Sequence, residues 1–235
     1  KIDFTKALVL NEIGESAVEG CTALTEVSLP TSLRIVGKNA FLKCYSLKSL
    51  EIPSQVTSLG EDIVKGCSAL TSLSVPFFGQ TKNEEAVLGR LFDYTYSNHT
   101  SLPWTLKTIA VTASPVIADH AFDSCGYVTT IKLPENTSTI GDYAFRGCYS
   151  LKTINMPSGL GYIGDYAFAN CGEIESITLP YGLYSIGSYA FNGCYSLTKI
   201  NFPETIYSIG SYAFSHLPIS GKLNFGAELR YIYDY

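Results

Sequence analysis

The chain has 235 residues, of which 46% are hydrophobic, and a formal net charge of -5 from 16 Lys and Arg against 21 Asp and Glu. A mildly acidic chain without a basic run excludes a nucleic-acid-binding surface, which needs clustered Lys and Arg. No apolar stretch approaches the roughly 20 residues that span a bilayer, so we expect no membrane insertion. The chain begins at Lys1 without a signal peptide, and we interpret it as a mature or trimmed chain.

A repeat of 23 residues organises the chain. Repeats of this length begin at residues 13, 36, 59, 117, 140, 163, 186 and 209; one long repeat of 35 residues occupies 82–116, and partial repeats occupy 1–12 and 232–235. A fixed period in this range is typical of solenoids, in which each repeat packs on its neighbours. Because the repeats account for the whole chain with no linker, the sequence predicts a single domain over residues 1–235.

Each repeat follows the pattern I-G-x-x-A-F-x-x-C-x-x-L-x-x-I-x-L-P. In the repeat that begins at Ile140, the segment 151–157 alternates apolar and polar residues, which predicts a strand ended by Pro157. Cys148 lies four residues after Ala144 and three after Phe145, and Leu151 lies three further on, which indicates a short helical or 3-10 segment. No repeat can bury its Phe, Leu and Ile alone, so neighbouring repeats must share one core.

This unit resembles the BspA-like class of leucine-rich repeats, and it recurs along essentially the whole chain. The resemblance implies a leucine-rich-repeat solenoid, a right-handed β/α superhelix with a parallel β-sheet on its concave face and short helical or 3-10 segments on its convex face. It also implies an extracellular or cell-surface protein of the bacterial adhesin type, which binds host proteins or other bacteria.

A cysteine occupies the ninth position of most repeats: Cys21, Cys44, Cys67, Cys125, Cys148, Cys171 and Cys194. Disulfides, a metal site and buried thiols are the three possible interpretations. Equivalent atoms of stacked turns lie at least about 4.7 Å apart, whereas the Cβ atoms of a disulfide lie about 3.8 Å apart. A straight row cannot converge on zinc, and the last repeat places the apolar Leu217 at this position. We therefore expect reduced, mostly buried thiols, with no metal and no cofactor.

Catalytic motifs are not evident. His99, His120 and His216 have no Cys, Ser or carboxylate partner at a motif spacing. Asp142 and Asp165 lie one repeat apart, and we interpret them as caps of helix starts rather than as a catalytic pair. The sequence therefore predicts a protein that is not an enzyme.

Tyrosine is abundant, with 17 in the chain. One column lies at the fourth repeat position, and a second lies just after the cysteine. The first column contains Tyr143, Tyr166, Tyr189 and Tyr212, and the second contains Tyr45, Tyr149 and Tyr195. Stacked tyrosines could bind a partner or a sugar, or could only cover the surface and stack on each other. We favour the second interpretation and keep the first as an alternative.

The strand residues that alternate with buried Ile and Leu should point outward. They are small, polar and mostly uncharged, which suits an extended ligand bound by many weak contacts. As candidate binding residues on this face we take Ser72, Ser74, Thr108, Thr130, Lys132, Thr153 and Asn155.

The long repeat breaks the regularity and holds the only tryptophan, Trp104. It either presents Tyr94, Tyr96 and His99 to a partner, or fills the core with Leu91, Phe92 and Trp104. We expect Trp104 to point inward, because a proline precedes it and a strand follows it.

These features together favour a non-enzymatic recognition module, which binds a host or bacterial surface protein or a glycan. Two alternatives remain open: a structural spacer within a larger surface protein, and a carbohydrate-binding surface that uses the tyrosine columns.

Overall fold

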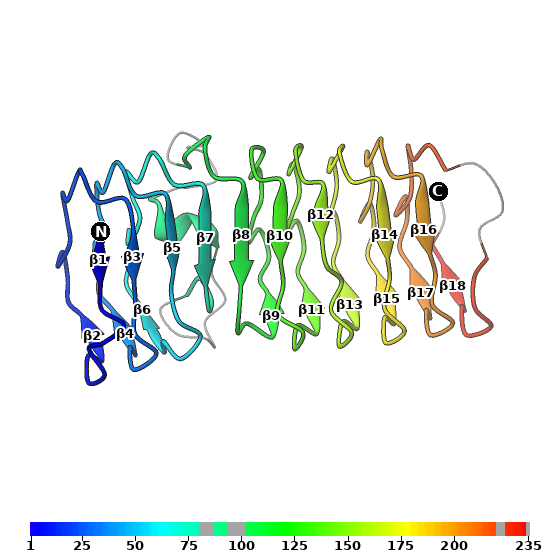
Figure 1. The fold of residues 1–235 in the computed structure, drawn as a ribbon. Coiled ribbons are helices and arrows are strands. Elements are labelled where there is room, and N and C mark those ends of the chain that lie inside the picture. Colours follow the sequence, from blue (N-terminus) through cyan, green and yellow to red (C-terminus); the bar gives the residue numbers. More distant parts are fainter. Residues whose placement is uncertain (80–86, 94–101, 220–223, 234–235) are drawn as a thin grey trace. The chain divides into compact units, whose positions relative to one another are not determined.

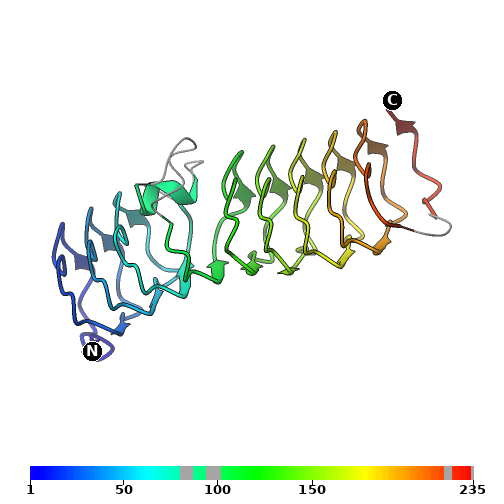
Figure 2. The same ribbon diagram turned by 90° about the horizontal axis from the view of Figure 1, so that it is seen from above.

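The computed structural model describes residues 1–79, 87–93, 102–219 and 224–233. The chain divides into two compact units, Lys1–Ser114 and Pro115–Tyr235. Within each unit the backbone winds through successive turns that lie side by side, coloured from blue to green in the first unit and from green to red in the second (Figures 1 and 2). The predicted solenoid architecture is confirmed within each unit, whereas a single domain over 1–235 stays a prediction.

Two sets of short strands form the turns. The first set contains β1 (Ile2–Asp3), β3 (Val27–Ser28), β5 (Ser49–Glu51), β7 (Ser72–Val75) and β8 (Thr108–Val111) in the first unit, and β10 (Thr130–Lys132), β12 (Thr153–Ile154), β14 (Ser176–Thr178) and β16 (Lys199–Asn201) in the second. The second set contains β2 (Glu12–Ile13), β4 (Ile35–Val36) and β6 (Ser58–Leu59) in the first unit, and β9 (Val116–Ile117), β11 (Thr139–Ile140), β13 (Tyr162–Ile163), β15 (Ser185–Ile186), β17 (Ser208–Ile209) and β18 (Tyr231–Ile232) in the second.

The strands pair in parallel, and their register follows the repeat. Thr130 on β10 pairs with Thr153 on β12, one repeat further along the chain. Across the long repeat, Ser72 on β7 still pairs with Thr108 on β8. The extra residues are therefore accommodated between two adjacent strands, and the sheet continues in register.

The Ala-Phe-Cys segments form turns rather than the short helices that their spacing predicts. Each holds two residues with positive φ four positions apart, for example Tyr143 at 56° and Gly147 at 70°. Backbone in the left-handed region interrupts a right-handed helix. The N–H group of Phe145 donates to the Ala167 carbonyl in the next turn at 2.7 Å, and that of Tyr143 donates to the Asp165 carbonyl at 2.8 Å. Hydrogen bonds that a helix would keep within itself thus join neighbouring turns.

A stack of phenylalanines fills the core of the second unit. The rings of Phe122, Phe145, Phe168 and Phe191 have centroids 4.9–5.1 Å apart along the row, and all four side chains are fully buried. Phe214 continues the row at 5.5 Å from Phe191. The prediction of a shared phenylalanine core is confirmed for Phe145, Phe168 and Phe191, whereas Phe214 at the end of the row is only half-buried.

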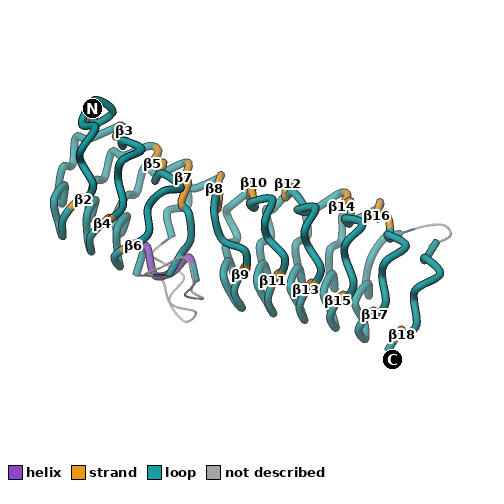
Figure 3. The backbone as a smooth tube through the Cα atoms, turned by 90° about the horizontal axis from the view of Figure 1, so that it is seen from below, coloured by secondary structure: helices purple, strands orange, loops and turns teal. Residues whose placement is uncertain are grey.

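The long repeat supplies the one helical segment among the described residues, η1 (Leu88–Leu91), drawn in purple in Figure 3. Backbone N–H groups of the preceding turn donate to it, from Asp62 to the Arg90 carbonyl at 2.9 Å and from Val64 to the Leu91 carbonyl at 3.1 Å. Leu91 and Phe92 are fully buried. This part of the repeat therefore replaces a regular turn and fills its share of the core, as one of the two interpretations predicts.

The prediction that Trp104 points inward is wrong, because its side chain is 69% exposed. Leu106, two residues later, is buried instead. Counted back from this leucine, Trp104 has the repeat position of Tyr149, which lies two residues before the buried Leu151. The strand register, and not the preceding proline, decides which way the ring points.

Candidate binding surfaces

The cysteine ladder is a structural feature. All seven thiols are free, and all except the exposed Cys21 are buried. Five of the Sγ atoms donate to the carbonyl oxygen 26 residues earlier at 3.1–3.2 Å; these pairs are Cys44–Val18, Cys67–Phe41, Cys148–Phe122, Cys171–Phe145 and Cys194–Phe168. The thiol thus fits a small apolar site that also contains one carbonyl acceptor. The predicted burial is confirmed for six of the seven thiols.

We expect thiol titration with Ellman's reagent to detect about one reactive thiol in the native protein, because only Cys21 is exposed. In denaturant the same titration should detect all seven cysteines of the chain. A Cys21→Ser variant serves as the control and should remove the native signal. Rapid reaction of several thiols in that variant would contradict the burial of the ladder.

Burial raises the pKa of the Cys67 and Cys194 thiols to about 12. An unfolded thiol titrates near pH 8.5, so the folded state keeps protons that the unfolded chain releases above that pH. The contribution to stability is complete below about pH 8.5 and is lost as the pH rises towards 12, at up to about 1.4 kcal/mol per thiol and pH unit.

Urea denaturation at pH 8 and at pH 10.5 measures this loss. We expect a lower free energy of unfolding at the higher pH. The double variant Cys67→Ala, Cys194→Ala should be less stable at pH 8 but should show a smaller decrease between the two pH values. An equal decrease in both proteins would show that these thiols do not cause the alkaline destabilisation.

The aspartates of the third repeat position connect neighbouring turns. Oδ1 of Asp119 accepts from the Asp142 N–H at 2.7 Å, Oδ1 of Asp142 accepts from the Asp165 N–H at 2.7 Å, and Oδ1 of Asp165 accepts from the Ser188 N–H at 2.6 Å. The prediction that Asp142 and Asp165 cap helix starts is wrong, because each accepts from the following turn. Each of these carboxylates is therefore held by a structural hydrogen bond.

The tyrosine column at the fourth repeat position is a continuous ring stack. Tyr143, Tyr166, Tyr189 and Tyr212 have centroids 4.7–4.9 Å apart, and the His120 ring stacks on Tyr143 at 4.8 Å. Each inner ring is covered on both faces by its neighbours. The column therefore presents ring edges rather than ring faces to solvent.

A buried carboxylate that the sequence did not indicate lies beside this column. Asp123 is 3% exposed. It accepts from Arg146 Nε at 3.2 Å and Nη2 at 2.8 Å, and its Oδ2 lies 2.8 Å from His120 Nδ1. The Arg146 guanidinium also lies 4.8 Å from the centroid of the Tyr143 ring. The cluster ties together two turns of the second unit, and the i, i+3 spacing of His120 and Asp123 was the available sequence signal.

The outward-pointing strand residues form the predicted polar wall, which we call the strand face. In the first unit it includes Ser72, Ser74 and Thr108, which are half-buried between neighbouring strands. In the second unit, Lys132 and Thr153 are exposed and Thr130 is half-buried. The alternating burial of the strands is confirmed, and binding by these residues stays a prediction.

Asn155 has a structural role within this face. Its Oδ1 accepts from the Leu133 N–H at 2.7 Å, and its Nδ2 donates to the Leu133 carbonyl at 2.9 Å. Asn201 repeats the arrangement with the backbone of Leu179 at 3.0 and 3.3 Å. The side-chain amide thus extends the strand pairing by one residue, and these amide atoms already have partners.

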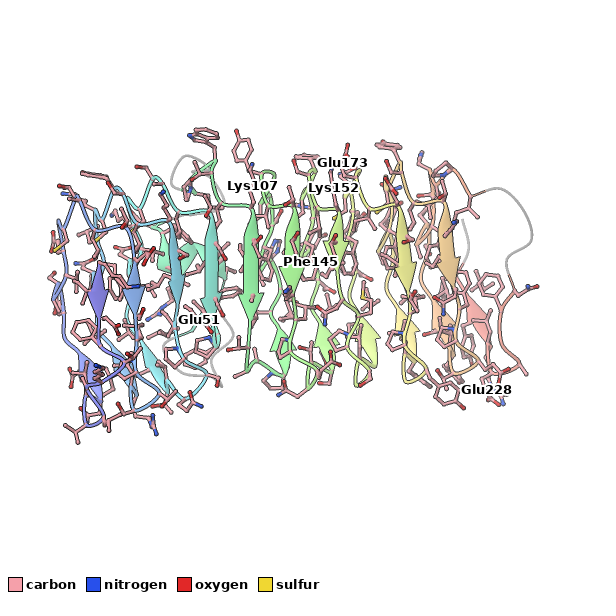
Figure 4. The ribbon with its side chains drawn as sticks, viewed as in Figure 1. Glu51, Lys107, Phe145, Lys152, Glu173 and Glu228 are labelled. Atoms are coloured by element: carbon pink, nitrogen blue, oxygen red, sulfur yellow. The ribbon has the colours of Figure 1, made fainter. Side chains whose placement is uncertain are left out.

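An open groove of about 400 Å³ lies on the first unit, near the ends of β3 and β5. Its lining includes Thr5, Ser28, Glu51, Pro53 and Gln55, and Glu51 is labelled in Figure 4. The groove is assembled from three turns, so no local sequence signal predicts it. The groove presents one carboxylate and several neutral polar groups. Its lining does not bring a nucleophile into contact with a base.

Four exposed aromatic rings, which we call the aromatic edge, lie just before strands of the first set. Each lies two residues before a buried leucine, and the exposed fractions are 47% for Tyr45, 69% for Trp104, 61% for Tyr149 and 67% for Tyr195. In the second unit, aromatic side chains project from the edge at which Lys152 and Glu173 are labelled (Figure 4). This edge contains the second tyrosine column of the sequence, and Trp104 is its unpredicted member.

Tyr94, Tyr96 and His99 lie outside the described residues, so their proposed contact with a partner stays a prediction. Among the described residues, no group of three or more His, Cys, Asp or Glu side chains could hold a metal ion. No helix in the same part of the chain is long and apolar enough to cross a membrane.

Parallel turns around one row of apolar side chains define a leucine-rich-repeat solenoid. Residues 1–113 and 116–235 match the family described as the BspA type leucine rich repeat region. The chain belongs to this family, and the resemblance predicted from the sequence is confirmed. No match was found among curated protein sequences.

Two solved structures that match this chain are of bacterial proteins. A leucine-rich repeat protein from Bacteroides ovatus is 29% identical with a TM-score of 0.51, over 90% of this chain and 46% of that one. A leucine rich cell surface protein from Faecalibacterium prausnitzii is 25% identical with a TM-score of 0.48, over 99% of this chain and 62% of that one. The chain thus spans less than two thirds of the length of either protein.

Proposed function

We propose that this chain is a non-enzymatic recognition module, located outside the cell or on its surface, that binds a host or microbial macromolecule. The proposed contact surface is the strand face together with the aromatic edge. The exposure of Tyr45, Trp104, Tyr149 and Tyr195 beside a small polar wall carries the proposal. Large exposed aromatic side chains supply binding energy at interfaces and otherwise favour aggregation.

The repeated thiols and carboxylates support a structural rather than a catalytic role. The buried thiols donate to backbone carbonyls, and the row of aspartates accepts backbone N–H groups. A structural spacer is the second candidate function, and these ladders alone would be sufficient for it. The exposed aromatic edge favours recognition, because a spacer gains nothing from it.

A binding panel tests the proposal. The immobilised chain is exposed to extracellular-matrix proteins, mucin and polysaccharides, and we expect saturable binding to at least one of them. The variant Lys132→Glu, Thr153→Glu places two carboxylates on the strand face and should weaken that binding. Lys38→Glu makes the same kind of charge change on an exposed side chain away from the strand face and is the control.

The long repeat is tested on the same panel. We propose that Tyr94, Tyr96 and His99 also touch the partner, so a variant with residues 93–101 replaced by a Gly/Ser linker should bind more weakly. Unchanged binding, with the circular dichroism spectrum intact, would remove these residues from the surface. A chain that binds no member of the panel would favour the spacer.

A further inference from the structure

The four rings of the aromatic edge form two pairs, one in each unit. Tyr149 and Tyr195 are separated by one intervening turn, which has Gly172 at the equivalent position. Tyr45 and Trp104 are likewise separated by the turn that holds Ser68. The turns are adjacent, because the Ser196 N–H donates to the Gly172 carbonyl at 3.2 Å and Thr105 Oγ1 donates to the Ser68 carbonyl at 2.9 Å. Each aromatic pair therefore flanks a turn with a very small side chain.

The space over Gly172 is open. A Cβ atom added to Gly172 would meet no heavy atom within 4 Å. A Cβ atom added to Gly126 would instead lie 3.3 Å from Cδ2 of Tyr149. The Tyr149 ring thus packs against the preceding turn. The opposite side of the ring points towards the Gly172 turn. The result is a slot between Tyr149 and Tyr195.

The width of the slot follows from the stacking of the turns. Neighbouring strands are about 4.8 Å apart, so equivalent residues two turns apart are separated by roughly 10 Å. A six-membered ring placed midway would lie roughly 5 Å from the turn that carries each tyrosine, and the flexible tyrosine side chains can bring their rings into contact range from there. This spacing suits one pyranose ring between the two tyrosines.

The absence of ring-on-ring stacking among the described residues distinguishes these side chains from the other tyrosine column. Tyr143, Tyr166, Tyr189 and Tyr212 already cover one another. Among the described residues, no ring stacks on Tyr45, Trp104, Tyr149 or Tyr195. The face of an aromatic ring is electron-rich, and the C–H groups of a sugar ring carry the complementary partial charge.

Polar side chains that can form hydrogen bonds with sugar hydroxyl groups lie beside the slot in the second unit. Lys152 Nζ and Glu173 Oε2 are 3.8 Å apart, and both side chains are more than half exposed. The pair offers donors and an acceptor side by side, which suits two neighbouring hydroxyl groups. Its charges balance, so the slot in the second unit does not select for a charged ligand.

We propose that the aromatic edge binds a glycan, with one pyranose ring between Tyr149 and Tyr195 and another between Tyr45 and Trp104. The inference rests on the proposed function and names its partner class. A specific protein partner would need roughly 800 Å² of contiguous contact surface on this chain. Single rings separated by small turns suit a chain of sugar rings better than a continuous protein surface.

The experiment uses cellohexaose, mannohexaose and chitohexaose as probes. Trp104 is the only tryptophan, so its fluorescence reports binding in the first unit, and calorimetry reports the total. We expect saturable binding of at least one hexasaccharide with a change in tryptophan emission. Tyr149→Ser together with Tyr195→Ser should weaken the calorimetric binding at the second unit by about tenfold, because two ring contacts are lost.

Two further variants make the test specific. Gly172→Tyr should fold, because the site is open, and should close the slot by stacking as the fourth-position tyrosines do, so binding at the second unit should be lost. Tyr181→Ser removes a 73% exposed tyrosine outside the aromatic edge and should leave binding unchanged. Retained binding at the second unit in Gly172→Tyr, or equal losses in Tyr181→Ser and the double variant, would overturn the proposal.

The outcomes separate this inference from the proposed function. Binding of a protein on the panel without binding of any hexasaccharide would overturn the glycan inference and leave recognition standing. Binding to heparin alone that disappears in high salt would assign the interaction to lysines and would also overturn it. Binding to neither panel nor hexasaccharides would overturn both.

Discussion

Replacement of Gly164 by alanine should destabilise the second unit by about 3 kcal/mol or more, because the new methyl group has no space. A Cβ atom at this position would lie 2.4 Å from Oδ1 of Asp142 and 2.6 Å from its backbone N. Neither atom can move freely, since Oδ1 accepts the Asp165 N–H. The turns approach so closely here that only glycine fits.

Gly172→Ala is the matched control for this substitution. It lies in the same repeat, has open space around the added atom, and has no left-handed φ. We expect a change within about 1 kcal/mol, with a slight gain from the smaller entropy of the unfolded chain. Chemical denaturation of both variants measures the difference. Equal losses would show that the close approach of the turns at Gly164 does not determine stability.

Phe168→Ala should cost about 3–5 kcal/mol, the usual range for a large cavity in a core. The ring is fully buried and stacks on Phe145 at 4.9 Å and on Phe191 at 5.1 Å. Phe214→Ala should cost less, because Phe214 is only half-buried and its centroid lies 5.5 Å from that of Phe191. Urea denaturation of the two variants compares them, and equal losses would contradict a stack stabilised by nearest neighbours.

The period and the apolar alternation were sufficient to predict the strands, their register and the phenylalanine core. A fixed repeat gives every turn the same set of inward positions, so a pattern seen at Ile140 also holds at Ile163. The burial of the cysteines followed from the geometry of stacking. Their hydrogen bonds to carbonyls could not be predicted, because they depend on backbone positions in the preceding turn.

The turns were mispredicted because apolar residues three or four apart occur both in helices and in this turn. The distinguishing feature is a pair of left-handed residues, and in the repeats that hold Tyr143, Tyr166, Tyr189 and Tyr212 the first residue of the pair is a tyrosine rather than a glycine. The pairing of Asn155 with Leu133 and the groove at Glu51 depend on neighbouring turns as well. Trp104 could have been placed correctly by counting back from Leu106 instead of forward from Pro103.

Hydroxyl-radical footprinting of the chain with a partner from the binding panel tests the central claim most directly. The claim is that the regular ladders hold the fold, whereas the aromatic edge and strand face make contact. We expect the partner to protect Tyr149 and Tyr195 from oxidation and to leave Tyr166 and Tyr189 unchanged. Protection of Tyr166 and Tyr189, with Tyr149 and Tyr195 unchanged, would contradict it.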